Sequence, residues 1–193
     1  MDESLRDELL AMAREDESVR DRLAADGSLF DGYHPEMERV HIGNAVRLEQ
    51  ILDTHGWPGR ELVGEDGTES AWLVVQHAIS HPGLMRRGLE MLRTVPDQDP
   101  ARVAMLEDRI RCFEGRSQQY GTQFDWDDNG DLSPLPIETP DEVDQRRAEL
   151  GLPSMAEAIT TMRESRPGDS APSDLARHRA EQDAWARRVG WRV

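Results

Sequence analysis

The chain has no lysine and a single cysteine among its 193 residues. All 23 basic residues are therefore arginines, which excludes Schiff-base and other lysine-centred catalysis. Cys112 alone forms no intrachain disulfide or multi-cysteine metal site, and its place in a helical apolar pattern is typical of a small core residue. The N-terminal MDESLRDELL has no basic region followed by an apolar run, and the sequence has no apolar stretch of about 18 residues. We therefore expect a cytoplasmic protein.

Positive charge is scarce as well. The formal net charge is -16 at pH 7 and the isoelectric point is about 4.7. Such a surface repels phosphate backbones and anionic membranes, so we expect neither nucleic acid nor a membrane as partner. A cationic or neutral partner is favoured instead, and we expect a small-molecule or peptide substrate. The length suits one domain with a core, or a domain plus a tail, and the sequence indicates no oligomeric state.

Apolar residues repeat with helical spacing through most of the chain. Between Leu5 and Leu23 they recur at intervals of three, four and seven, which predicts an amphipathic helix. Prolines at positions suited to helix starts predict further helices over 35–55, 82–92 and 100–113. Thr68 caps another predicted helix, residues 68–80, whose apolar residues cover most of its circumference. We expect this helix at the centre of the fold, packed by the second, fourth and fifth helices.

The periodicity changes after the fifth helix. Phe124 and Trp126 alternate with acidic residues before a turn, which predicts a β-hairpin near residues 120–137 with its aromatics on the core. Capping boxes at 139–142 and 154–157 predict two short helices. Residues 166–174 have the composition of a linker, and a C-terminal helix over 175–193 is either docked or independent. The predicted fold is mainly α, a single helical domain over residues 1–165 with a short hairpin and an appended C-terminal helix.

Polar residues interrupt two of the predicted apolar helix faces. His41 and Asn44 share a face of the second helix with apolar residues, so they need either structural hydrogen-bond partners or a ligand. Gln76 and His77 stand on the central helix, where His77 is either a general base or a satisfied core residue. His77 and His81 have the i, i+4 spacing of a helical metal half-site. Because a proline adjoins His81 and no glutamate follows His77, we expect no metal.

A second polar cluster precedes the hairpin. Tyr120 and Gln123 enclose a Gly-Thr pair, where a phenol and an amide could orient a ligand or could pin the hairpin to the helices. Arg109, on the fifth helix, could clamp a carboxylate or pair with a neighbouring acid. Because the central helix is too apolar for a solvated face, we expect Tyr120 and Gln123 to lie close to His77.

Several motifs in order resemble an uncharacterised bacterial family, a domain of unknown function. They are GWPG at 56–59, AWLVVQHA at 71–78, EGRSQQYGTQ at 114–123 and VDQRRAELGLPS at 143–154. The resemblance covers roughly residues 44–158. It implies signature positions at Trp57, Gln76, His77, Arg109, Tyr120 and Gln123 and carries no settled activity. At position 81 the histidine departs from the aspartate expected in many relatives.

The sequence favours a small enzyme acting on a polar small molecule or a peptide side chain through histidine-centred acid/base chemistry. A hydrolase or lyase type is the most plausible. His77 is the expected general acid/base, Tyr120 the second proton donor, and no cofactor is expected. The expected substrate-binding residues are His41, Asn44, Trp57, Trp72, Gln76, Arg109 and Gln123. The alternative is a non-catalytic binding or interaction module for a basic peptide or protein partner.

Overall fold

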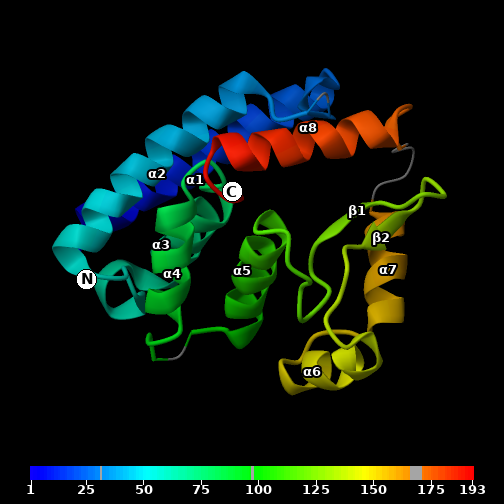
Figure 1. Ribbon diagram of the computed structural model, residues 1–193. Helices are drawn as coiled ribbons and strands as arrows, with labels where there is room; N and C mark the ends of the chain where they lie inside the picture. Colours follow the sequence, from blue (N-terminus) through cyan, green and yellow to red (C-terminus); the bar gives the residue numbers. More distant parts are fainter. Residues whose placement is uncertain (31, 97, 166–170) are drawn as a thin grey trace. The chain divides into compact units, whose positions relative to one another are not determined.

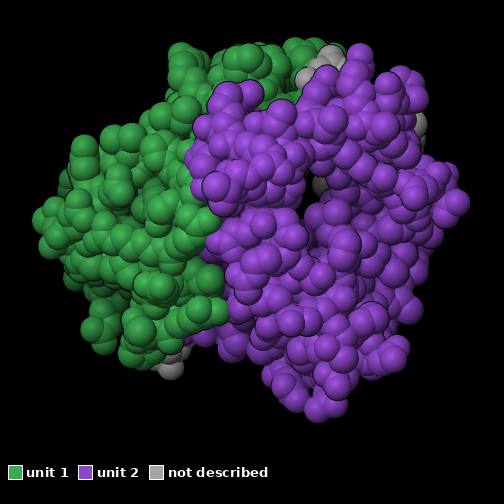
Figure 2. Space-filling model, in the orientation of Figure 1, with its two compact units in different colours: residues 1–97 green, residues 98–193 purple. Residues whose placement is uncertain are grey.

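The computed structural model describes residues 1–30, 32–96, 98–165 and 171–193. The described residues are mainly helical and include a small antiparallel hairpin (Figure 1), as the sequence predicts. The chain divides into two compact units, the N-terminal unit of residues 1–97 and the C-terminal unit of residues 98–193, coloured separately in Figure 2. Within the described ranges, no helix is both long and apolar enough to cross a membrane.

The N-terminal unit is built from helices. Its elements are α1 (Glu3–Ala25), the 3-10 helix η1 (Ser28–Phe30), α2 (Pro35–His55), α3 (Arg60–His77) and α4 (Pro82–Leu92). The long helices α1 and α2 lie side by side, and α3 packs on both of them as well as on α4 (Figure 1). The core consists of side chains with at most 2% of their surface exposed, among them Leu9, Leu48, Ile51, Leu52, Val63, Val74, Met85 and Leu92.

Local sequence signals set most of these helix ends. The Asp2 carboxylate accepts the Leu5 N–H at 3.0 Å and caps α1. Pro35 and Pro82 occupy the first turns of α2 and α4, where the missing N–H costs nothing. Gly56, with a φ of 72°, ends α2 in a conformation that other residues rarely adopt. The predicted helices over 35–55 and 82–92 are therefore confirmed, as is the one over 100–113, where Pro100 opens the helix.

Helix α3 differs from the prediction at both ends. It begins at Arg60, is kinked at Gly64 (φ 75°), and ends at His77, because Ala78 leaves the helical conformation with a ψ of 37°. Thr68 does not cap a helix start; its hydroxyl instead donates to the Pro58 carbonyl oxygen at 2.9 Å. The sequence analysis also overlooked α1 as a packing partner of α3.

Helices α3 and α4 approach each other closely at Gly88. A Cβ atom at this position would lie 2.6 Å from Cγ2 of Val75, a side chain that is fully buried on α3. Such a distance is shorter than any ordinary carbon–carbon contact. Glycine is therefore required here to let the two helices pack at this separation.

The C-terminal unit combines helices with the hairpin. Its elements are α5 (Pro100–Phe113), β1 (Phe124–Trp126), β2 (Leu132–Pro134), the 3-10 helix η2 (Pro140–Glu142), α6 (Val143–Glu149), α7 (Met155–Glu164) and α8 (Leu175–Arg188). Strands β1 and β2 pair antiparallel, with Phe124 opposite Pro134 and Trp126 opposite Leu132. Phe124 and Trp126 are only half-buried, so the expectation that both aromatics lie in the core is wrong.

The two predicted capping boxes have different outcomes. Ser154 and Glu157 form the reciprocal hydrogen bonds of a capping box at the start of α7. Thr139 instead has a left-handed backbone with a φ of 47° and precedes the 3-10 helix η2, so that capping prediction is wrong. A left-handed residue cannot adopt the extended conformation that a helix cap requires.

Helix α8 packs within the C-terminal unit. The ring of Trp191 stacks on Phe113, with centroids 5.2 Å apart, and Trp185 contacts the same ring at 5.5 Å. Arg192 donates to the carbonyl oxygens of Cys112 and Phe113, at 2.9 and 2.8 Å. Residues 166–170 of the predicted linker lie outside the described residues.

Candidate functional site

A carboxylate lies on the buried face of α1. Asp16 continues the stripe formed by Leu5, Leu9 and Met12, and only 1% of its surface is exposed. A buried carboxylate is costly unless other groups compensate its charge. Its Oδ2 atom lies 2.8 Å from Nδ1 of His77 on α3 and 3.2 Å from Nε2 of His41 on α2. Three helices of the N-terminal unit thus each contribute one polar side chain to a common point.

His41 is held from both sides. Its Nδ1 atom lies 2.7 Å from the Tyr33 hydroxyl, which precedes α2. The centroids of the His41 and His77 rings are 5.1 Å apart. Although Nε2 of His41 is close to Asp16, its orientation does not meet hydrogen-bond geometry, so among the described residues this nitrogen has no hydrogen-bond partner. The Oδ1 atom of Asp16 is likewise buried without such a partner in the described part of the chain.

The electrostatics of the cluster keep Asp16 ionised. Burial raises the pKa of the Asp16 carboxyl, but the ring nitrogens of His41 and His77 outweigh this effect, and the net pKa is lowered. The carboxylate is therefore negatively charged at neutral pH. An ionised Asp16 accepts the Nδ1 proton of His77, which places the basic lone pair of that imidazole on Nε2.

Beside the cluster lies an open cavity at the protein surface, with a volume of about 430 Å³. Asp16 and His77 form part of its wall, together with Leu73 of α3 and a group of charged side chains on α1, namely Glu17, Arg20 and Asp21. At 17% exposure, the His77 side chain is the most accessible of the three central groups. A small polar molecule in this cavity would contact an imidazole, carboxylates and one guanidinium.

A family model described as a family of unknown function, DUF6624, matches residues 3–167. The chain belongs to this DUF6624 family. Its matched region contains Asp16, His41 and His77 as well as the motifs before the hairpin. The chain matches no curated protein and no solved structure. Membership of DUF6624 therefore names a family but assigns no activity.

The other predicted site residues of the N-terminal unit are buried or half-buried. The Asn44 side-chain amide donates to the Met12 carbonyl oxygen at 3.2 Å, which links α2 to α1. Trp57 is 8% exposed and would lie 3.8 Å from a Cβ at Gly88, so it packs against α4. Gln76 is 3% exposed and Trp72 is half-buried, both on α3. Because α3 ends at His77 and α4 begins at Pro82, His77 and His81 do not share one helix, and the i, i+4 metal geometry does not form.

The loop of the C-terminal unit that carries Tyr120 is firmly anchored. The buried Asp108 carboxylate accepts backbone N–H groups of Gln119, Tyr120 and Thr122, at 2.6 to 3.1 Å. Buried Gln118 bonds the backbone of Gln123 in both directions, at 2.9 Å each. These contacts support the structural interpretation of this loop, which pins the hairpin to α5.

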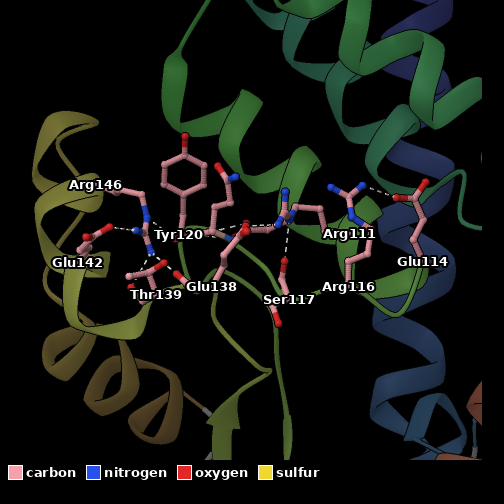
Figure 3. Close-up of polar contacts among 11 residues, drawn as sticks. Arg111, Glu114, Arg116, Ser117, Tyr120, Glu138, Thr139, Glu142 and Arg146 are labelled. Carbon is pink, nitrogen blue, oxygen red and sulfur yellow. Dashed lines mark hydrogen bonds and ion pairs between the residues drawn. The ribbon is translucent and has the colours of Figure 1, made fainter.

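Arginines reinforce the same loop. Arg146 on α6 donates to the carbonyl oxygen of Gln119 at 2.9 Å, and its guanidinium also reaches the carbonyl oxygens of Glu138 and Thr139 (Figure 3). Figure 3 shows Tyr120 beside this cluster. Tyr120, Gln123 and Arg109 belong to the C-terminal unit and His77 to the N-terminal unit. A joint site of His77 with Tyr120 and Gln123 stays a prediction.

The sequence analysis missed Asp16 and Tyr33. One signal for Asp16 was available: the apolar spacing on the first helix runs 5, 9, 12 and then 19 and 23, and position 16 completes it. A charged residue at the centre of an apolar stripe indicates a buried partner. Tyr33 carries no such signal, because its neighbour His41 becomes apparent only once the chain is folded.

Proposed function

We propose that this chain is a small enzyme that acts on a polar small molecule or a peptide side chain by acid/base chemistry centred on His77. The observation that carries this proposal is the 2.8 Å contact between Nδ1 of His77 and the buried Asp16 carboxylate, at the wall of a cavity. A carboxylate in this position orients the imidazole, fixes its tautomer and stabilises the imidazolium formed when Nε2 takes up a proton.

The charges of the cavity wall favour a substrate with a neutral or cationic polar group. Glu17 and Asp21 add negative charge beside Asp16, and Arg20 offers one guanidinium. In a hydrolase or lyase reaction, Nε2 of His77 would remove a proton from water or from the substrate and return it to the leaving group. Asp16 would keep its charge throughout. Tyr120 as a second proton donor belongs to the same proposal and is tested separately by Tyr120→Phe.

The test is a comparison of variants against a complex substrate mixture. Wild-type protein, His77→Ala and the matched control His55→Ala, an exposed histidine at the end of α2, are incubated with a bacterial metabolite extract. Mass spectrometry then identifies compounds that are consumed. We expect at least one compound to be consumed by the wild type and by His55→Ala, with a rate about 10² to 10⁴ lower in His77→Ala. Asp16→Asn should show a comparable loss, since the tautomer of His77 is no longer fixed.

Thermal unfolding of each variant separates catalysis from folding. Equal consumption by His77→Ala and wild type would refute the role of His77. If wild-type protein consumes nothing and instead retains one compound through gel filtration, the binding-module alternative gains support.

A further inference from the structure

The acid/base pair leaves one member of the cluster unexplained. His77 and Asp16 suffice for proton transfer, yet Nε2 of His41 also lies 3.2 Å from the same carboxylate oxygen. That nitrogen, Nε2, is buried and lacks a hydrogen-bond partner among the described residues, as does Oδ1 of Asp16. A buried imidazole nitrogen and a buried carboxylate oxygen without partners, on two residues in contact, indicate that a further group satisfies them.

The spacing of the three side chains identifies the chemical class of that group. One ligand atom each from Asp16, His41 and His77 lies within 4.8 Å of the others. Atoms bound to one metal at about 2.0–2.2 Å, in tetrahedral or octahedral geometry, are about 2.8 to 3.6 Å apart. The distances from Asp16 Oδ2 to the two imidazole nitrogens are 2.8 and 3.2 Å. Both fall within this range.

We propose that Asp16, His41 and His77 bind a divalent transition metal ion. Two imidazoles and one carboxylate are a donor set suited to zinc and to iron, manganese or cobalt in the divalent state. The three ligands come from α1, α2 and α3, helices that the N-terminal unit packs together. Asp16 and His77 border the cavity, so the coordination positions that these three side chains leave open would face it. This replaces the expectation of no metal, which considered only the pair His77 and His81.

The protonation of the ligands is consistent with metal binding. Asp16 is already ionised, so it releases no proton. His41 would bind through Nε2 as a neutral imidazole with its proton on Nδ1, and this N–H would donate to the Tyr33 oxygen 2.7 Å away. A hydrogen bond to the second ring nitrogen is the usual way in which a protein orients a histidine ligand. His77 would bind through Nδ1 after its proton moves to Nε2, so the net proton count does not change.

The metal site goes beyond the proposed function, because it stands even if the chain catalyses nothing. If the chain is an enzyme, the metal-bound state transfers the role of base from His77 to a water molecule on the metal. A divalent zinc ion lowers the pKa of bound water to about 7. The reaction class favoured for that state is hydrolysis of a polar substrate.

The experiment is metal titration of the full-length chain produced without a histidine tag and treated with a chelator. Calorimetry with Zn²⁺, and absorption spectroscopy with Co²⁺ as a probe, report affinity, stoichiometry and geometry. We expect one equivalent bound and a thermal midpoint that rises with metal concentration. His41→Ala, His77→Ala and Asp16→Asn should each weaken binding at least 100-fold. The controls His55→Ala, His81→Ala and His178→Ala should bind as the wild type does.

A measurement on wild-type protein covers the case in which a variant fails to fold. X-ray absorption at the zinc edge should show two imidazoles and one or more oxygen ligands. Binding weaker than about 100 μM for both metals, or a spectrum without imidazole, would overturn the metal site whatever the outcome for turnover. If the titration shows metal binding and the metal-free protein nevertheless turns over substrate, the metal site is supported and His77 itself acts as the base.

Discussion

The close approach of α3 and α4 offers a test of the packing that positions His77. In Gly88→Ala, the new Cβ would lie 2.6 Å from Cγ2 of Val75. Carbon atoms in contact are about 3.5 to 4.0 Å apart, so one of the helices has to move by about 1 Å. Val75 is fully buried, and a β-branched residue in a helix has one strongly preferred rotamer, so the side chain itself cannot give way.

The expected change in the unfolding free energy of Gly88→Ala is the sum of two opposing effects. Overpacking in a well-packed core costs about 1–3 kcal/mol. Replacing glycine by alanine inside a helix gains about 0.5–1 kcal/mol, because the unfolded chain loses conformational freedom. We therefore expect Gly88→Ala to lower the free energy of unfolding by about 1–2 kcal/mol. The matched control is Gly43→Ala on α2, where no described atom lies within 4 Å of the added Cβ. Gly43→Ala should therefore raise the free energy of unfolding by about 0.5–1 kcal/mol.

Equilibrium unfolding in guanidinium, followed by circular dichroism, measures both variants against the wild type. The expected difference in unfolding free energy between Gly88→Ala and Gly43→Ala is about 1.5–3 kcal/mol, which equilibrium unfolding resolves. A Gly88→Ala chain as stable as Gly43→Ala would refute the reasoning, since it would mean that α3 and α4 do not press together at this point.

Two further predictions concern the C-terminal unit. Burial, and then the charge of Asp108, raises the pKa of the Cys112 thiol to about 12. Its alkylation by iodoacetamide at pH 8 should therefore be about a thousandfold slower in native than in unfolded protein, whose thiol pKa is about 8.5; equal rates would contradict this. Trp191 is 4% exposed and stacks on Phe113. Trp191→Ala should cost about 3–5 kcal/mol in unfolding free energy, and a change below about 1 kcal/mol would show that α8 does not stabilise the unit.

Where the sequence carries an explicit signal for a helix end, the fold could be predicted. Pro35, Pro82 and Pro100 mark the starts of α2, α4 and α5 because proline fits the first turn and no later one. The start of α3 could not be predicted in this way. Gly64, with a φ of 75° and a ψ of 177°, interrupts the helical conformation inside α3, and no local pattern marks where the helix resumes.

The sequence predicted only part of the candidate site, because local patterns mark single residues and do not specify tertiary packing. His41 and His77 stand out because each interrupts an apolar helix face. Asp16 resembles the many surface acids of a chain with 39 acidic residues, and only its place in the apolar spacing sets it apart. That the three side chains meet at one point depends on how α1, α2 and α3 cross, which no local pattern specifies. The prediction of a site shared by His77 and Tyr120 remains open.

The end of α3 at His77 has an electrostatic consequence for what can enter the cavity. The carbonyl end of a helix carries a partial negative charge equivalent to about half an electron. His77 lies in this last turn, and the ionised Asp16 carboxylate lies 2.8 Å from its Nδ1 atom. Positive charge on or beside the imidazole is therefore stabilised by two independent sources, whereas an anionic group arriving first is repelled by both. This polarity favours an order of occupation in which a proton or a metal ion binds first and any anionic ligand follows.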